Sequence, residues 1–216
     1  MKFCVIGLGR FGYKVAETLA SQGMEVLAID RREEVVADIK DKVTQAICMT
    51  VTDIKSLEAV GVEDVDTAIV GMGKNIEQSV LITALLKQFL KITTVISRSN
   101  NTIHEEILKL VGADKVIFPE DENGERLAKN LSFPLIDIIG ITPEFSITQI
   151  TAPIKFVGKN IGDLKLRESR RVVCIGVKKG KNIALVGFDY TILEDDQLIF
   201  AGENHYLEGI ARLSAE

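Results

Sequence analysis

The sequence predicts an α/β protein in which a doubly wound parallel sheet is followed by a small α+β module. Three observations lead to this fold class. Short apolar segments alternate with longer amphipathic segments through residue 131. A glycine-rich turn follows the first apolar segment, and after residue 131 the pattern becomes one dominated by strands. Alternating strands and helices are typical of a parallel sheet covered by helices on both faces.

Six segments are expected to form buried strands because they are short and apolar, and several are rich in Val and Ile. They are Lys2–Ile6, Glu25–Ile29, Gln45–Cys48, Thr67–Val70, Thr93–Ile96 and Lys115–Phe118. Apolar residues at helical spacing predict helices between and after them, at Phe11–Gln22, Glu33–Lys42, Asp53–Val60, Asn75–Leu90, Thr102–Val111 and Glu120–Leu131. Asp53 can cap its helix, and Gly23 and Gly112 can end theirs. Six βα units predict a Rossmann-like sheet with its ligand at the carboxyl ends of the strands.

The second module begins near Ser132, so the predicted domains are residues 1–132 and 133–216. Strands are expected at Ser146–Ile150, Val172–Val177, Ile183–Val186 and Gln197–Ala201, with a short helical turn at Asp163–Arg167 and a final helix at Glu203–Leu213. Gly180-Lys181-Asn182 suits a turn between two of these strands. The apolar stretch Phe133–Ile141 has two interpretations, a contact between subunits or an internal strand.

Composition excludes some classes of function. The 216 residues carry a net charge of −5, which argues against a general nucleic-acid surface. No apolar run reaches membrane-spanning length, so work at a membrane would require a partner. The three cysteines, Cys4, Cys48 and Cys174, lack metal-ligand spacing and fall in predicted strands. We expect them to be buried small hydrophobes in a reducing cytosol.

The turn after the first strand has the spacing Gly7-x-Gly9-x-x-Gly12 and opens a helix. Gly7 permits the tight turn, Gly9 lets a phosphate approach the backbone, and Gly12 lets helix and strand pack closely. The helix N-terminus offers N–H groups and partial positive charge to an anion. Asp30, which closes the second strand, can accept hydrogen bonds from ribose hydroxyls. This combination predicts an adenine nucleotide site.

Three arginines flank this site. Arg10 lies inside the turn, where its guanidinium could reach phosphate oxygens, which suits the more anionic phosphates of ATP or ADP. Its alternative role is that of a solvated surface arginine. Arg31 and Arg32 follow Asp30 and could suggest a reader of the NADP 2′-phosphate, but the adjacent acid would repel that phosphate. We therefore expect Arg31 and Arg32 to be plain surface charge.

Groups for proton transfer are scarce. The two histidines, His104 and His205, are both expected on solvated helix faces. No zinc cluster, P-loop lysine or Ser/His/Asp set is apparent. We therefore expect a protein that is not an enzyme and that uses a bound nucleotide as a signal.

Several motifs together resemble one family. They are V-I-G-L-G-R-F-G with Asp30, N-I-E-Q-S-V from Asn75, I-S-R ending at Arg98, G-A-D-K-V-I-F-P-E from Gly112 to Glu120, and I-L-E-D-D-Q-L-I-F-A-G near the C-terminus. They resemble the RCK (KTN) family, closest to the KtrA/TrkA type: cytosolic regulatory subunits of bacterial potassium transporters. The resemblance spans nearly the whole chain.

The resemblance implies binding of ATP/ADP or NAD(H) in the first domain, without catalysis. The implied nucleotide-binding residues are Gly7, Leu8, Gly9, Arg10, Phe11, Gly12, Asp30, Arg31, Thr50, Thr52, Asp53, Gly71, Asn75 and Arg98. Glu120 is implied as a ligand of a divalent or monovalent cation at a dimer interface. Such proteins assemble as dimers or octameric rings. They sit at the inner face of the cell membrane through a potassium-translocating subunit of the TrkH/KtrB type.

The sequence also departs from the family pattern. Met49-Thr50 replace a Gly-Asp found in many relatives, so the adenine contacts from Thr50 to Asp53 differ from theirs. Arg170-Arg171-Val172-Val173 fill a region where relatives that bind cyclic di-AMP have an asparagine, so we do not expect cyclic di-AMP. Two other functions remain open: an NAD-dependent oxidoreductase, and a structural ring subunit that no longer binds nucleotide.

Overall fold

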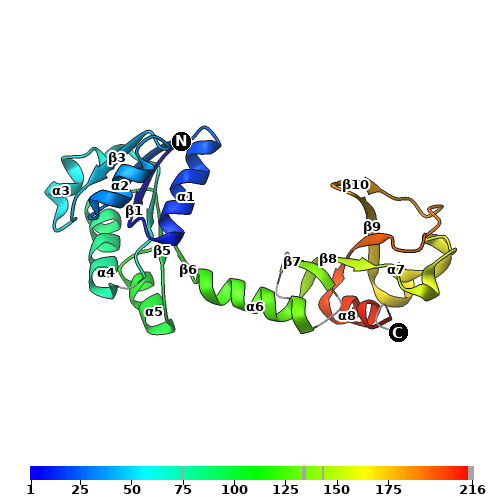
Figure 1. Cartoon of the computed structure of the whole chain (residues 1–216). Helices are drawn as coiled ribbons and strands as arrows, with labels where there is room; N and C mark the ends of the chain where they lie inside the picture. The colour runs from blue at the N-terminus through cyan, green and yellow to red at the C-terminus, as the bar shows by residue number, and fades with distance from the viewer. Residues whose placement is uncertain (74, 133–134, 143, 214–216) are drawn as a thin grey trace. The chain divides into compact units, whose positions relative to one another are not determined.

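The computed structural model describes residues 1–73, 75–132, 135–142 and 144–213. Residue contacts divide the chain into two units, Met1–Glu120 and Asp121–Glu216. Figure 1 colours the first from blue to green and the second from green to red. No helix within the described residues combines the length and the apolar character that a bilayer crossing requires.

The first unit contains a six-stranded sheet in which every pairing is parallel. Its strands are β1 (Lys2–Ile6), β2 (Glu25–Asp30), β3 (Gln45–Cys48), β4 (Thr67–Val70), β5 (Thr94–Arg98) and β6 (Lys115–Ile117). Their spatial order is β3-β2-β1-β4-β5-β6. The order reverses between β1 and β4, and ligands of doubly wound sheets bind at that switch point. The predicted Rossmann-like sheet is confirmed, with strand ends within two residues of those expected.

Helices lie between the strands in the predicted places. They are α1 (Arg10–Ser21), α2 (Glu33–Ile39), α3 (Ile54–Glu58), the 3₁₀ turn η1 (Val62–Asp64), α4 (Ile76–Ala84), η2 (Leu85–Phe89), α5 (Thr102–Leu110) and α6 (Pro119–Ser132). The long helix predicted at Asn75–Leu90 is instead α4 continued by η2, a π-helical segment. The predicted cap at Asp53 is present, and Gly23 and Gly112 adopt positive φ after α1 and α5.

Two apolar cores cover the two faces of the sheet, because side chains alternate along each strand. Cys4 and Ile6 of β1 pack with Leu57 of α3 and Leu86 of η2. On the other face, Val5 packs in one cluster with residues of α1 and α2, including Ala16 and Ile39. This double layer fixes the carboxyl ends of the strands, where the candidate site lies.

The second unit contains an antiparallel sheet in the order β10-β9-β11-β8-β7. The strands are β7 (Leu135–Gly140), β8 (Phe145–Thr151), β9 (Val172–Lys179), β10 (Asn182–Leu185) and β11 (Gln197–Glu203). Short helical segments η3 (Ile154–Phe156), η4 (Gly162–Leu164) and α7 (Leu166–Arg170) precede β9, and α8 (Asn204–Leu213) follows β11. Phe200, Leu198 and Ile210 are fully buried in its core.

The apolar stretch Phe133–Ile141 therefore contains an internal strand, β7, which pairs with β8. Phe133 and Pro134 lie outside the described residues. Ile139 of β7 and Ile141, just after the strand, are exposed, so this segment does not bury all of its apolar surface within one chain. The alternative interpretation, a contact between subunits, stays a prediction.

Candidate functional site

Three glycines bring the backbones of β1, α1 and β4 together at the switch point. Gly7 has φ +91, and a Cβ there would lie 2.3 Å from Cγ of Met72. A Cβ on Gly12 would lie 2.1 Å from the carbonyl oxygen of Gly7, and one on Gly71 would lie 2.6 Å from the same oxygen. The N–H of Gly71 donates to the carbonyl of Ile6 at 2.8 Å. Only glycine fits these three positions.

Gly9 differs from its neighbours in the turn. It is the N-cap residue of α1 with φ −67, and a Cβ there would meet nothing within 4 Å. No side chain caps the helix, and the first turn carries no acidic residue. The N–H groups and positive dipole end of α1 are therefore available to an anion that approaches over Gly9.

The side chain of Arg10 begins α1 next to this opening. It is exposed, and its guanidinium can reach outward toward a phosphate chain placed on the turn. Leu8 is buried and Phe11 is half-buried against the core. The backbone N–H of Leu8 donates to Asp30, so Leu8 helps to position that carboxylate.

Asp30 lies at the carboxyl end of β2, beside the glycine turn, and is 7% exposed. Its carboxylate accepts a hydrogen bond from the N–H of Leu8 at 2.7 Å. It also forms an ion pair with Arg32, whose Nε and Nη2 each lie 3.0 Å from a carboxylate oxygen. Burial opposes ionisation of Asp30, but the hydrogen bonds from Arg32 and Leu8 outweigh it and hold the pKa below its ordinary value.

The prediction that Arg32 is plain surface charge is therefore wrong. Its guanidinium also donates from Nη2 to the carbonyl of Leu8 at 3.0 Å, so it bridges β2 and the glycine turn. Arg31 is exposed, and its carbonyl oxygen lies 3.6 Å from the thiol sulfur of Cys48. The backbone N–H of Arg32 also donates to Oδ1 of Asp30 at 2.9 Å, so the turn after β2 holds Arg32 beside the carboxylate.

The loop after β3 carries Thr50, Thr52 and Asp53, all of them exposed. Asp53 caps α3 by accepting from the N–H of Ser56 at 2.9 Å. Asn75 caps α4 in the same way, accepting from the N–H of Gln78 at 3.1 Å. Both predicted site residues therefore have structural roles as caps, which leaves part of each side chain for a ligand.

Gln78 is a residue that the sequence reasoning missed. Its side-chain amide donates to the carbonyl of Val51 and ties the start of α4 to the loop after β3. The N-I-E-Q-S-V motif contained the residue, but its sequence position gave no sign that it contacts a loop so far away along the chain.

Arg98 ends β5 and extends along the carboxyl edge of the sheet. Its side chain is 19% exposed, and its Nη2 is paired with the carboxylate of Glu120. The guanidinium lies close to Gly73, since a Cβ there would be 3.1 Å from Cζ of Arg98. Its Nε is buried without a hydrogen-bond partner in the described part of the chain. A ligand phosphate near Gly73 would satisfy that donor.

Asn100 supports this edge and was also missed. Its side-chain amide donates to the carbonyl of Gly73 at 2.7 Å, and its Oδ1 lies 3.2 Å from Nδ1 of His104. The side chain of Asn100 thereby fixes the loop after β4 to the start of α5.

Glu120 was predicted as a cation ligand. It is 66% exposed and pairs with Arg98. Among the described residues, no three acidic, histidine or cysteine side chains gather closely enough to hold a metal ion. A cation at Glu120 would therefore need oxygen ligands from a bound phosphate or a second chain.

Two further predictions about single residues are wrong. His104 is 1% exposed on the inner face of α5, and its Nε2 is buried. Cys48 is exposed at the end of β3, where the sheet edge leaves it uncovered. Cys4 and Cys174 are buried as expected, and burial raises the pKa of the Cys4 thiol to about 12. His205 is exposed, as predicted.

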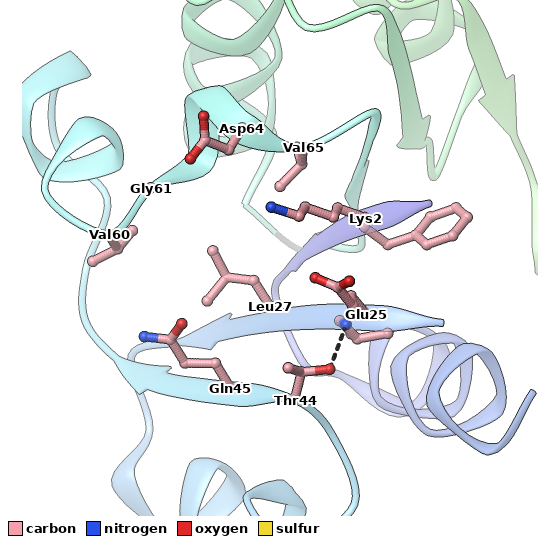
Figure 2. Close-up of a pocket in the computed structure, with 11 residues that line it drawn as sticks. Lys2, Glu25, Leu27, Thr44, Gln45, Val60, Gly61, Asp64 and Val65 are labelled. Atoms are coloured by element: carbon pink, nitrogen blue, oxygen red, sulfur yellow. Dashed lines mark hydrogen bonds between the residues drawn. The ribbon is translucent and has the colours of Figure 1, made fainter. Parts of the chain in front are cut away.

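A separate cleft of about 230 Å³ lies at the amino ends of β1 and β2. Figure 2 shows that Lys2, Glu25 and Gln45 border it, and the N–H of Val26 donates to the hydroxyl of Thr44 at 3.0 Å. Ligands of doubly wound sheets bind at the carboxyl ends of the strands. This cleft is at the opposite edge and contains none of the predicted site residues.

Two domain families match the chain. The TrkA-N domain matches residues 3–119, and the TrkA-C domain matches residues 149–214. The chain belongs to the TrkA-N family. The TrkA-N match covers the six-stranded sheet, including the glycine turn, Asp30 and Arg98.

Two relatives of this TrkA-N chain are named as potassium uptake proteins. It is 34% identical over 203 residues to Ktr system potassium uptake protein A of Bacillus subtilis (strain 168), covering 93% of this chain and 91% of the relative. It is 32% identical, with the same coverage, to Ktr system potassium uptake protein C of that organism.

Solved structures show the same fold. The crystal structure of the GsuK RCK domain superposes with a TM-score of 0.66 at 17% identity, covering 100% of this chain and 48% of that chain. The GsuK channel bound to NAD superposes with a TM-score of 0.54 at 19% identity, covering 99% and 38%. At these identities the likeness shows the fold alone. The RCK fold expected for a TrkA-N protein is thus confirmed.

Proposed function

We propose that this chain is a nucleotide-sensing regulatory subunit that gates a membrane potassium uptake channel or transporter through bound ATP/ADP or NAD(H). The observation that carries the proposal is the open phosphate-binding turn at Gly9, flanked by Asp30, Arg10 and Arg98 at one edge of the sheet. The relatives that are named as potassium uptake proteins support the choice of potassium uptake as the process that this chain would regulate.

The nucleotide would lie across the carboxyl ends of the strands. Its phosphates would approach the N–H groups of α1 over Gly9, and its ribose would bind at Asp30. The adenine would lie near Thr50 and Thr52, where the loop after β3 is exposed.

Arg10 would distinguish ATP from ADP. It is exposed at the start of α1, so it can pair with a terminal phosphate that ADP lacks. A ligand shifts an equilibrium between two conformations only by its differential affinity for them. One charge-assisted contact worth about 1.4 kcal/mol changes affinity about tenfold per site. Coupled sites in an oligomer would multiply that factor without hydrolysis.

Arg98 would provide a second phosphate contact near Gly73. In that arrangement its guanidinium would exchange the Glu120 carboxylate for a phosphate. Glu120 would then be available to a cation near the phosphates, at an interface with a second chain.

The proposed assembly is a dimer or an octameric ring in the cytoplasm. It would dock on a potassium-translocating subunit of the TrkH/KtrB type at the inner face of the membrane. We propose no enzymatic activity for the chain and no role in binding nucleic acid.

A thermal-shift panel of ATP, ADP, NAD, NADH and cyclic di-AMP tests the proposal, because a ligand of the native state raises the melting temperature. The wild-type chain should respond to adenine nucleotides and respond more to ATP than to ADP. Arg10→Ala should remove the difference between ATP and ADP while the chain stays folded. Lys40→Ala, which removes an exposed positive charge at the end of α2, is the control and should keep the difference.

Two outcomes would overturn the proposal. One is the absence of any shift with every nucleotide offered, which would favour a structural ring subunit. The other is steady turnover of NADH with a small substrate, followed at the absorbance of the reduced cofactor, which would favour an oxidoreductase.

A further inference from the structure

The carboxylate of Asp30 has no acceptor site left for a ribose. It accepts four hydrogen bonds: from the backbone N–H of Leu8 at 2.7 Å, the backbone N–H of Arg32 at 2.9 Å, and Nε and Nη2 of Arg32, each at 3.0 Å. A carboxylate has about four lone-pair positions. A ribose that uses Asp30 must therefore displace one or more of these donors.

The donors differ in how easily they can leave. The two backbone N–H groups belong to the glycine turn and to the end of β2, and they cannot leave without a change in the fold. The two guanidinium N–H groups belong to a side chain that is 52% exposed. Since water can replace its contacts, the Arg32 side chain can rotate away at a small cost.

The guanidinium of Arg32 donates hydrogen bonds to both carboxylate oxygens of Asp30, as the two hydroxyls of a bound ribose would. Its Nε donates to Oδ1 of Asp30 and its Nη2 donates to Oδ2. The cis-diol of a ribose has two O–H donors on neighbouring carbons, and these can donate to the same two carboxylate oxygens of Asp30. The arrangement of Arg32 on Asp30 therefore has the donor pattern of a bound ribose diol.

We propose that Arg32 is an intramolecular competitor for the ribose subsite, and that its displacement from Asp30 sets the affinity for every ligand with a free ribose diol. The inference rests on the proposed function, which assigns the ribose to Asp30. Only the fraction of chains with Arg32 displaced can bind the ribose fully, and this fraction lowers the apparent affinity. The site would thereby respond to higher nucleotide concentrations than the same site without Arg32.

Displacement of Arg32 also changes the glycine turn. The same Nη2 donates to the carbonyl of Leu8 at 3.0 Å, so leaving Asp30 releases that carbonyl. Ribose binding is thereby linked to the backbone that precedes Gly9, where the phosphates would approach. A ligand without the two ribose hydroxyls would leave Arg32 in place.

Calorimetric titration of the full chain with ATP and with 2′,3′-dideoxy-ATP tests the inference. Arg32→Ala should bind ATP about three- to tenfold more tightly than the wild-type chain. Lys40→Ala removes a positive charge from an exposed position at the end of α2 that takes no part in the Asp30 bonds, and it should not tighten binding. With dideoxy-ATP, Arg32→Ala should show no gain over Lys40→Ala, because no hydroxyls use the freed acceptors.

Several results would overturn it. Arg32→Ala could bind ATP no more tightly than the wild-type chain, or more weakly, which would mean that Arg32 contacts the ligand directly. An equal gain with dideoxy-ATP would mean a general effect that does not involve the diol. If Arg32→Ala fails to fold, Arg32→Lys keeps the charge without the two-donor fork and should show a smaller gain of the same kind.

The two proposals fail in different ways. If no form of the protein binds any adenine nucleotide, the proposed function is wrong and the inference falls with it. If all forms bind ATP but removal of Arg32 does not tighten binding, the inference alone is wrong.

Discussion

Individual glycines in the turn after β1 have opposite requirements. Gly12 has no room for a side chain, because a Cβ would lie 2.1 Å from the Gly7 carbonyl oxygen. Gly9 has open space around it and an ordinary negative φ. The fold therefore requires glycine at position 12, whereas at position 9 we propose that the ligand is the reason for glycine.

Alanine substitutions should separate these two roles. Gly12→Ala should destabilise the chain by about 3 kcal/mol or more, because α1 must move away from β1. Gly9→Ala should change stability by less than about 1 kcal/mol, since its Cβ meets nothing. It should nevertheless weaken nucleotide binding, because the methyl group lies where the phosphates approach.

Urea unfolding and ATP titration of both variants measure the two effects. A Gly9→Ala chain that binds ATP as tightly as the wild type would contradict the assignment of the phosphates to this turn.

The glycines and Asp30 were predictable from the sequence because their spacing is typical of a strand, a tight turn and a helix followed by a second strand. Arg32, Gln78 and Asn100 were not, because their roles depend on where side chains point after the sheet has formed. Arg32 lies two residues from Asp30, yet only the turn at the end of β2 brings its guanidinium over the carboxylate. The sequence shows that the charges are near one another but not that they pair.

In helix α5, too, the sequence predicted the element but not the direction in which one of its side chains points. Its amphipathic pattern predicted the helix well, but His104 lies on its buried face with Leu108 one turn later. Burial lowers the pKa of His104 below its ordinary value of about 6.5. The unfolded chain thus takes up a proton at a higher pH than the folded chain, so stability is fully present above about pH 6.5 and falls as the pH drops through the folded pKa.

His104→Gln should therefore reduce the loss of stability between about pH 7.5 and pH 5.5, measured by urea unfolding. Glutamine does not titrate, so no proton uptake accompanies unfolding at this position. His205→Gln, on the exposed face of α8, is the control and should lose stability with falling pH as the wild-type chain does. Equal pH dependence in both variants would contradict the role of His104.

Element boundaries were predictable where local signals mark them. Asp53, Gly23 and Gly112 placed helix ends correctly, because caps and positive-φ glycines act locally. Strand β7 was only one of two interpretations, since an apolar run is compatible with an internal strand or with a contact surface. Its pairing with β8 depends on contacts in the second unit that no local pattern reveals.

At the scale of the whole molecule, no hydrophobic core among the described residues is shared between the two units. The first unit has one core around Cys4 and Val95 and another around Val5, and the second unit has a core around Phe200 and Ile150. The contacts divide the chain after Glu120, near the start of α6, and we propose residues 1–132 as the nucleotide-binding domain.

A fragment of residues 1–132 should therefore fold alone and show the same ATP-dependent rise in melting temperature as the full chain. The reason is that the sheet, both of its covering layers and all proposed nucleotide contacts lie within it. Circular dichroism and thermal shift would check this. A fragment that folds but no longer responds to ATP would show that the second unit, or assembly through it, completes the site.

The pairing of Arg98 with Glu120 joins the end of β5 to the first turn of α6. Glu120 is 66% exposed, and an ion pair with such an exposed partner contributes about 1 kcal/mol or less to stability. An anion that took the guanidinium of Arg98 would therefore detach the first turn of α6 from the end of β5 at little cost in free energy.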